Sequence, residues 1–329
     1  MLACDLGYGS TKIFGHSGGL VIASHVATDS RSVVHHTAIK SRKPPMEIVT
    51  GEGSFYVGLG AHDWGRPVEN LDLDRFNGTP ELRALLYGAL SEHSHRPIPE
   101  MSEPDLPKGH IRLIVGLPLT LLSGQAEDVR ERVAAVKSFL KGAHSWSVNG
   151  RACAITVAEV LIASQADGTL FDYLLDDQGV MTPAKKREFK SEIGIVNIGM
   201  NTVDLLVSEG GAIKQKFTAG DTRGVRRLLQ LLNTDDLYSL GELDAQLRAG
   251  ALDVSSRLPT WQREILGFID DQWSRQFRRF ARVVCAGGGA ILLSDALLKR
   301  FGGKVYIPDD PVISTARGLF KYALMRERK

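Results

Sequence analysis

The chain has 329 residues, of which 43% are apolar, and its 40 basic and 38 acidic residues give a formal net charge of +2. This length is sufficient for two domains of ordinary size, and the apolar content is sufficient for their cores. The near balance of charge argues for neither a nucleic-acid binder nor an acidic-surface specialist. No apolar run reaches the ~20 residues of a membrane span, and no basic segment followed by an apolar core begins the sequence. We therefore expect a soluble protein without a membrane partner.

The three cysteines, Cys4, Cys153 and Cys285, lie within apolar, strand-like runs. They form no CxxC pair, and neither they nor the paired histidines have the spacing of a metal site. This cysteine usage is typical of a reducing compartment, and we expect a cytoplasmic protein.

The segment 4–13, CDLGYGSTKI, is the first motif that indicates chemistry. Its apolar lead-in predicts a buried strand, and its two close glycines allow a tight turn and a close backbone approach to a ligand. Asp5, at the strand end, can hold a hydrated divalent metal. The segment predicts a phosphate-binding hairpin, although Gly-x-Gly turns also close ordinary hairpins. Its candidate phosphate-binding residues are Gly7, Tyr8, Gly9, Ser10, Thr11 and Lys12.

The first half continues with strands and two helices. Strands are predicted at 20–27, 32–39, 46–57 and 111–117, the third as two strands around a Gly-Glu-Gly turn. Helical spacing of apolar residues predicts helices at 80–91 and 125–141, with Ser123 as a candidate cap of the second. The proline-rich segment 93–108 is predicted to be a loop.

The middle of the chain repeats the design of the first hairpin. A strand at 154–163 leads through 164–168 into a helix at about 169–175. The segment 193–207, IGIVNIGMNTVDLLV, is again an apolar strand, a polar end, a glycine and a resumed strand. Two such hairpins suggest two like-folded halves that face one another. The residues of interest in the second hairpin are Asn197, Gly199, Met200, Asn201, Thr202 and Asp204.

A third segment, 282–293, runs from a strand into Gly287, Gly288 and Gly289, where a flat base or a ribose could be admitted. The remaining elements are a strand at 212–217, helices at 224–232, 239–249, 260–282 and 291–301, a strand at 305–307 and a final helix. The arginines of 260–282 form a basic face that could bind an acidic partner, but solvated basic faces are more common.

The order and spacing of the two hairpins and the glycine triplet resemble those of the actin-like ATPases, a superfamily that also contains heat-shock chaperone ATPases and sugar kinases. Three further segments extend the resemblance to ParM-type plasmid-segregation actins and archaeal actin-like proteins. These are the GLPL turn at 116–119, the Gly220-Asp221 step, and a proline followed by a small-Ala-Arg-Gly step at 311–318. The resemblance therefore covers nearly the entire chain.

The resemblance implies an α/β, actin-like (ribonuclease H-like) fold of two domains, with a nucleotide in the cleft between them. Domain I would comprise 1–160 and about 308–329, with an inserted subdomain at about 30–110. Domain II would comprise 161–307, with a helical subdomain at about 220–282. The implied cofactors are ATP or GTP, and Mg²⁺ held by Asp5 through water.

The resemblance also implies roles for single residues. Gln165 matches the Glu or Gln that orients the attacking water, and Glu159, on the preceding strand, is the competing candidate. Asn197 replaces an Asp that helps to organise the metal and the water, so slow hydrolysis is the natural hypothesis. Asp204 matches the acidic residue that closes this motif, and Met200 replaces a residue that is often small. Gly220 and Asp221 would contact the ribose or base, unless Asp221 and Thr222 cap the next helix.

The implied function is a nucleotide-dependent, filament-forming ATPase that acts as a cytomotive protein in plasmid or replicon segregation. Its partners would be further copies of itself, joined head to tail, and a DNA-bound adaptor protein, without direct contact to nucleic acid. Two alternatives remain at this point: a non-polymerising small-molecule kinase of the same fold, and a nucleotide-binding scaffold with little turnover.

Overall fold

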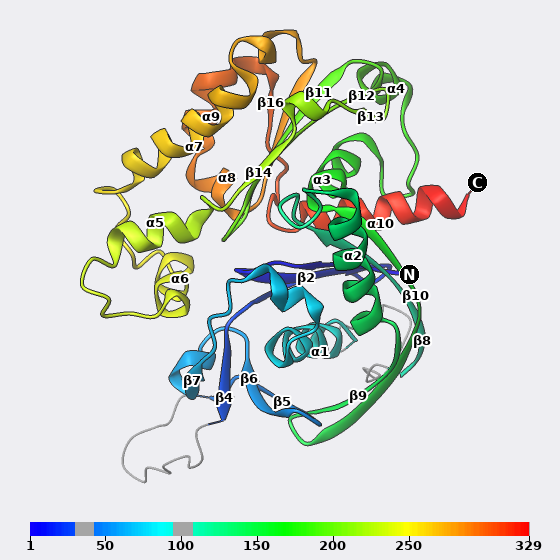
Figure 1. Ribbon diagram of the computed structural model, residues 1–329, viewed down its shortest axis with the longest axis vertical. Coiled ribbons are helices and arrows are strands. Elements are labelled where there is room, and N and C mark those ends of the chain that lie inside the picture. The colour runs from blue at the N-terminus through cyan, green and yellow to red at the C-terminus, as the bar shows by residue number, and fades with distance from the viewer. Residues whose placement is uncertain (30–42, 95–107, 329) are drawn as a thin grey trace.

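Two β-sheets organise the residues that the computed structural model describes, which are 1–29, 43–94 and 108–328 (Figure 1). In these residues, the first half of the chain forms a ten-stranded sheet and the second half a six-stranded sheet. The first sheet has the order β3 (Gly18–Ala23), β2 (Ser10–Gly15), β1 (Leu2–Leu6), β8 (Lys108–Leu117), β10 (Arg151–Ser164), β9 (Gly142–Val148), β5 (Met46–Thr50), β6 (Gly53–Val57), β4 (Val26–Asp29) and β7 (Gly65–Pro67). The second has the order β13 (Ala212–Ile213), β12 (Val203–Glu209), β11 (Glu192–Ile198), β15 (Arg282–Ala286) and β16 (Val305–Tyr306), with β14 (Ala219–Asp221) paired to β12.

The two sheets share one local design. In the first, β1 and β2 form an antiparallel hairpin, and β8 lies parallel to β1 on its other side. In the second, β11 and β12 form the hairpin, and β15 lies parallel to β11. The duplication predicted from the two hairpin sequences is therefore present in the strand pairing.

The helices cover these sheets and join them. Their bounds are α1 (Pro80–Ser94), α2 (Ala126–Leu140), α3 (Gln165–Leu174), α4 (Pro183–Phe189), α5 (Val225–Leu232), α6 (Leu240–Arg248), α7 (Leu258–Trp273), α8 (Gly288–Leu292), α9 (Ser294–Phe301) and α10 (Ser314–Glu327). Within the described residues, no helix has the length and apolarity to cross a membrane.

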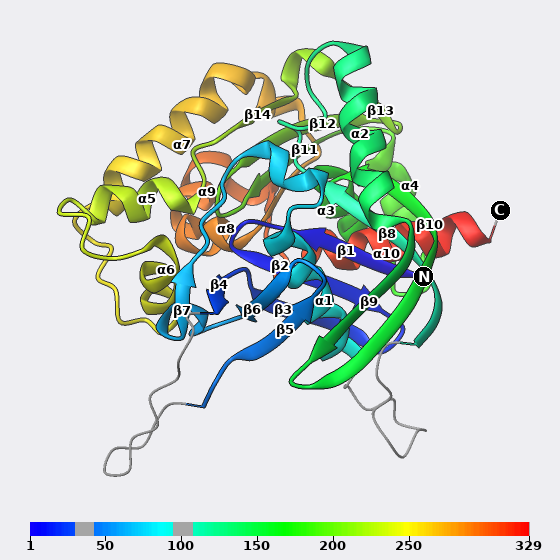
Figure 2. The same ribbon diagram turned by 60° about the horizontal axis from the view of Figure 1, so that its bottom comes forward.

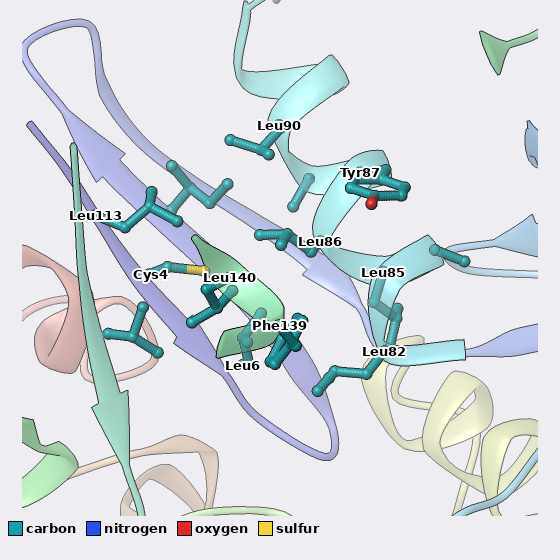
Figure 3. Packing of buried hydrophobic residues seen from close by; sticks show 14 of the residues in the cluster. Cys4, Leu6, Leu82, Leu85, Leu86, Tyr87, Leu90, Leu113, Phe139 and Leu140 are labelled. Carbon is teal, nitrogen blue, oxygen red and sulfur yellow. The ribbon is translucent and has the colours of Figure 1, made fainter. Parts of the chain in front are cut away.

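The core of the first half lies between β1 and helix α1. Cys4 and Leu6 of β1 pack with Leu82, Leu86 and other apolar residues of α1, as Figure 3 shows. Because successive side chains of a strand point to opposite faces, the neighbouring Ala3 packs instead on α10. Both faces of β1 are thereby buried, and its carboxyl end is held firmly.

Helices α3 and α10 connect the two sheets. Ala166, Leu170 and Leu174 of α3 belong to an apolar cluster with strands of the second sheet, whereas Leu319 and Phe320 of α10 belong to a cluster with strands of the first. The two helices cross closely, since a Cβ added to Gly318 would lie 1.8 Å from the carbonyl oxygen of Gly168. This apolar crossing lies between the sheets in Figure 1.

A buried charge cluster accompanies the crossing. Asp172 of α3 accepts two hydrogen bonds of 2.7 Å from Arg317 and one of 3.0 Å from Lys321, both on α10. These bonds hold the pKa of Asp172 below its ordinary value against the opposing effect of burial, which is the largest single influence. A buried carboxylate needs such partners, so the cluster fixes how the two helices meet.

Several predicted elements differ from the structure at their ends. Ser123 does not cap α2: its hydroxyl donates to the carbonyl oxygen of Leu119 at 2.6 Å, and Gln125 is the N-cap residue. The strand predicted at 20–27 is two strands, β3 and β4. The helix predicted at 169–175 begins four residues earlier, at Gln165, because Ser164 forms a capping box with Asp167.

Further corrections concern the second half. The strand predicted at 212–217 is limited to Ala212–Ile213 and is followed by a 3-10 turn. The helix predicted at 260–282 ends at Trp273, because Ser274 adopts a positive φ of 44°, and Arg282 begins β15. The helix predicted at 291–301 is the pair α8 and α9. The strand at 32–39 and most of the loop at 93–108 lie outside the described residues, although α1 extends to Ser94.

Candidate functional site

A cavity of about 350 Å³ lies where the two hairpins meet. Both halves of the molecule line it, and most of the predicted phosphate-binding residues do so. From the first half they are Asp5, Gly7, Tyr8, Gly9, Ser10, Lys12 and Gln165, and from the second Asn197, Gly199, Met200, Asn201, Thr202, Gly287 and Gly288. The structure therefore brings together four segments that are far apart in the sequence, namely the two hairpins, Gln165 and the glycine triplet.

Asp5 of the first hairpin is buried and held by two side chains. It is 2% exposed and lies directly across from Lys12 in the β1–β2 pairing. Lys12 Nζ donates to Asp5 Oδ2 at 2.9 Å, and Gln165 Nε2 donates to Asp5 Oδ1 at 2.7 Å. Both carboxylate oxygens are therefore occupied by protein donors.

Gln165 is placed by the end of β10 and the start of α3. As the first residue of the helix, after the Ser164 capping box, it is fixed in position with 8% exposure. Because an ionised carboxylate can only accept, the contact to Asp5 must come from the Gln165 amide nitrogen. Its Oε1 atom is then the acceptor that is left for a ligand or a water.

Glu159, the competing candidate, does not line the cavity. It lies on β10 beside a register shift in the pairing with β8 and forms a surface ion pair with Arg112 at 2.8 Å. Both side chains are nearly half exposed, at 46% and 45%. The geometry thus favours Gln165 over Glu159 for a role at the cavity.

The second hairpin carries a buried carboxyl at a different place from the first. Asn197, at the end of β11, pairs across the strands with Asp204, just as Asp5 pairs with Lys12. Asp204 is fully buried; its Oδ1 accepts from the Leu119 backbone N–H at 3.3 Å, and its Oδ2 has no partner among the described residues. Burial, with a smaller contribution from the charge of Asp5, raises the pKa of Asp204 to about 7.

The tips of the two hairpins touch each other. A Cβ added to Gly9 would lie 2.6 Å from Cβ of Met200, which is shorter than any ordinary contact. Met200 also packs against the apolar cluster of the second half. This contact accounts for the unusual residue at position 200: the methionine fills the space that glycine leaves at the facing turn.

Five predicted site residues do not line the cavity. Thr11 is buried and shares a 3.1 Å hydrogen bond with Ser24, and Asp204 lies in the core of its hairpin. Gly289 packs on Ile198, where a Cβ would lie 2.2 Å from the side chain.

Gly220 and Asp221 lie on β14, and Asp221 pairs with Arg223 at 3.1 Å. Neither Asp221 nor Thr222 caps α5, because its N-cap residue is Gly224.

Several cavity residues escaped the sequence analysis. Asp244, Leu247 and Arg248 lie on α6, and the others are Pro118, Val225, Ile291, Leu292, Val312 and Thr315. Helix α6 was predicted at 239–249, but its residues form no recognisable motif. Arg248 Nη2 donates to the Gly9 carbonyl oxygen at 2.9 Å and to Ser10 Oγ at 3.0 Å. Only the tertiary structure brings this arginine to the first hairpin.

Comparison with known proteins identifies the architecture. The family described as "Actin like proteins N terminal domain" matches residues 3–168. The archaeal actin homologue Ta0583 in complex with ADP is 17% identical, with a TM-score of 0.69 over 100% of this chain and 99% of that chain. Actin-like protein Alp7A is 14% identical, with a TM-score of 0.73 over 99% of this chain and 96% of that chain.

A 15-stranded ParM filament from Clostridium botulinum is also similar: it is 18% identical, with a TM-score of 0.69 over 98% of this chain and 97% of that chain. No curated protein matches this sequence. At these identities the structures establish the fold alone. The predicted actin-like fold, with its two sheets, is confirmed.

Proposed function

Because this chain belongs to the family of actin-like proteins, we propose that it is a nucleotide-dependent, filament-forming ATPase with a cytomotive role in plasmid or replicon segregation. The observation that carries the proposal is the convergence of two glycine-containing hairpins and a glycine-led helix on one cavity between the two halves. Backbone N–H groups in such turns form concave anion sites, which suits a phosphate chain. The similar structures include one with ADP and one in a filament.

The cavity fits a nucleotide in size and in polarity. Its volume of about 350 Å³ lies within the usual range for small-molecule sites. The polar hairpin residues supply one part of the wall, and Val225, Leu247 and Ile291 with their neighbours supply an apolar part. Asn201 Oδ1 is buried without a partner among the described residues, so it could accept a hydrogen bond from a bound ligand. We infer that residues 7–10, Lys12 and residues 199–202 hold the phosphates of ATP or GTP.

The same site fits Mg²⁺. This ion is commonly held by one or two carboxylates together with substrate phosphates. Asp5 is engaged by Lys12 and Gln165, so it would hold the ion through water. When bound, the ion would neutralise phosphate charge.

The residues at the cavity also suggest how hydrolysis proceeds. Gln165, fixed through Asp5, would orient the attacking water with its Oε1 atom, and phosphoryl transfer depends mainly on such positioning and on charge stabilisation. Asn197 can hydrogen-bond water but adds no negative charge. We therefore propose that turnover is slow.

The remaining features of the proposal concern organisation and partners. Domain I would comprise 1–160 and about 308–329, and domain II 161–307, with nucleotide binding drawing them together. Self-association would be head to tail, a heterologous contact that does not close on itself. A DNA-bound adaptor would capture the filament, so that direct contact with nucleic acid is unnecessary. All three cysteines are free and buried, in keeping with a cytoplasmic location.

One second function has a specific observation in its favour. Asn197, where the first hairpin has Asp5, would suit a nucleotide-binding scaffold with little turnover. Tight ATP binding without phosphate release distinguishes that scaffold from a dynamic filament. Sugar-stimulated ATP consumption without assembly would instead indicate a kinase.

A paired assay tests the proposal. Light scattering and pelleting with Mg-ATP or a non-hydrolysable analogue measure assembly, and phosphate release is followed in the same ATP sample. The expected result is assembly with either nucleotide, and slow phosphate release followed by disassembly in ATP. A Lys12→Ala variant, which removes a cation from the cavity, should lose nucleotide-dependent assembly. Absence of assembly by the wild-type protein at every concentration would overturn the filament proposal.

A further inference from the structure

Helix α6 belongs to the second half by its packing and to the first half by its hydrogen bonds. Its apolar residues Leu240, Leu243 and Leu247 pack in the apolar cluster of the second half. Its polar residues contact the first half at both ends of the helix. In Figures 1 and 2, α6 lies beside β4 and β7, at the edge of the first sheet.

The contact at the C-terminal end of α6 is a continuous chain of hydrogen bonds. His25 Nε2 donates to Asp244 Oδ2 at 2.8 Å, and Arg248 Nε donates to the same oxygen at 2.7 Å. Arg248 Nη2 then reaches Gly9 and Ser10 of the first hairpin. This series of hydrogen bonds begins at His25 and ends at Gly9 and Ser10, all in the first half, and it passes through α6 of the second half.

The contact at the N-terminal end of α6 is also polar. Ser239 Oγ and His62 Nδ1 share a hydrogen bond of 3.0 Å, and the Gly241 backbone N–H donates to Glu69 at 3.0 Å. His62 and Glu69 lie in the same part of the first half as His25, whose ring centroid is 5.3 Å from that of His62. Together the two contacts form a polar interface along α6.

This polar interface differs in kind from the α3–α10 crossing, which also connects the halves. The α3–α10 crossing buries apolar side chains against both sheets and contains a buried ion cluster. Apolar, closely packed contacts resist separation, whereas polar interfaces between domains open and close more readily. The α3–α10 crossing is therefore suited to act as a pivot, and the polar interface along α6 is suited to open and close.

We infer that Arg248, held by Asp244 and His25, is a positioning residue that fastens the second half onto the phosphate-binding hairpin and so couples closure to nucleotide binding. The inference rests on the proposed function, since it assigns a device to the same cavity. Arg248 itself lines that cavity beside Ser10 and Lys12. Its guanidinium thus contributes positive charge from the second half at the place where phosphates would bind.

The burial of Asp244 explains why the three residues act together. Its side chain is 5% exposed and that of His25 is 6% exposed, whereas the side chain of Arg248 is 35% exposed. A buried carboxylate is stable only with donors around it, so Asp244 holds Arg248 in one orientation. Loss of Asp244 would release Arg248 from this orientation, and loss of either donor would leave the carboxylate under-satisfied.

The test measures nucleotide affinity and the separation of the halves in the same variants. Arg248→Ala removes the clamp, and Arg248→Lys keeps the charge but loses the planar fork that reaches Asp244 and the hairpin together. The matched control is Arg278→Ala, which removes an exposed arginine of the second half. Spin labels at Gly51→Cys and Gln230→Cys, both exposed and one in each half, report the separation by pulsed electron resonance.

The expected result is a longer and broader label distance in nucleotide-free Arg248→Ala than in the control. Its dissociation constant for a fluorescent ATP analogue should rise about 10- to 100-fold, as expected for the loss of charge-assisted hydrogen bonds. Arg248→Lys should recover part of both effects, and Asp244→Asn should resemble Arg248→Ala. A purely structural role would instead lower the melting temperature without this graded recovery.

The inference is overturned if Arg248→Ala keeps both the wild-type label distance and the wild-type affinity. It is also overturned if Arg248→Lys is no better than Arg248→Ala in both readouts while remaining folded. Should the wild-type protein bind no nucleotide, the proposed function fails, but the label distance in the nucleotide-free variants still decides whether the clamp exists.

Discussion

Gln165 donates a 2.7 Å hydrogen bond from Nε2 to Oδ1 of Asp5, and this bond joins the first residue of α3 to the carboxyl end of β1. The bond fixes the amide in one orientation, because the carboxylate can only accept. The oxygen of the amide is therefore available to a water molecule, and the nitrogen is not. This orientation supports the proposal that Gln165 positions the attacking water, because the amide itself is too weakly basic to remove a proton.

Removal of this positioning group should slow hydrolysis without preventing assembly. Gln165→Ala should lower the rate of phosphate release by about 100-fold, since the loss of correct positioning costs on that scale. Assembly with a non-hydrolysable ATP analogue should persist, because the hairpins that are proposed to bind phosphate are unchanged. Phosphate release and pelleting on the same preparation measure both quantities.

Glu159→Gln is the matched control, since Glu159 lies on the adjoining strand and pairs with Arg112 at the surface. Exposed pairs of this kind contribute little to stability. Turnover in this variant should equal that of the wild type. If Glu159→Gln loses activity and Gln165→Ala does not, the assignment of the two residues is reversed.

The buried carboxyl of Asp204 should make stability depend on pH in a particular direction. Burial raises its pKa in the folded protein to about 7, above the ordinary aspartate value of 3.8, so the folded state retains the proton to higher pH than the unfolded chain. The stabilising effect of the protonated form is complete below pH 3.8 and is lost as the pH rises to about 7. The nucleotide-free protein therefore carries an ionisation penalty above neutrality.

Asp204→Asn should remove this penalty. The amide keeps the size of the side chain and an oxygen that can accept from the Leu119 N–H, and it does not ionise. At about pH 8 the melting temperature should rise by about 4 °C or more, and the gain should shrink as the pH falls through 7. Thermal unfolding followed by circular dichroism at several pH values checks this. A gain that is equal at pH 5 and pH 8 would show that ionisation of Asp204 is not its cause.

The main features of the fold could be predicted because they depend on local patterns. The two hairpins appear in the sequence as apolar strands that end in a polar residue and glycine, and the strand pairing follows from those patterns. Helix α1 is predicted by the spacing of its leucines, which are buried in the structure. The likeness of the two hairpins indicates two halves that face one another, and the family resemblance adds a nucleotide in the cleft between them.

Residues that act across the two halves could not be predicted in the same way. Arg248 and Asp244 lie on an ordinary amphipathic helix, and their partners His25 and Gly9 are more than 200 positions away. Element ends were missed where one residue decides them, as at Ser274, whose positive φ ends α7 before the basic segment. The methionine at position 200 is explained only by its contact with Gly9, which the sequence does not reveal.

The proposed slow turnover can be tested by restoration of the carboxyl at position 197. Asn197 is 6% exposed and lines the cavity, so an aspartate there would place a negative charge where water and metal are proposed to bind. Asn197→Asp should raise Mg-dependent phosphate release about tenfold, through better organisation of the metal and the water. The nucleotide-free protein should become less stable near neutral pH, because the new carboxyl lies across from Asp204.

Asn197→Ala separates the gain of charge from the loss of the amide in this experiment. The alanine variant should release phosphate no faster than the wild type. If turnover in Asn197→Asp equals or falls below that in the wild type, residue 197 does not limit hydrolysis.

The contact between the two hairpin tips leads to a last prediction, on the close approach at Gly9. Gly9→Ala would place Cβ 2.6 Å from Cβ of Met200, so the tips must move apart. Because both tips are proposed to hold the same phosphates, we expect ATP affinity to fall about tenfold or more. The double variant Gly9→Ala/Met200→Ala should regain much of this affinity, since the shorter side chain gives the new methyl group more room. Gly51→Ala is the control, because a Cβ there would meet no described atom within 4 Å. Equal affinities in the single and double variants would show that the clash with Met200 is not what sets the distance between the hairpins.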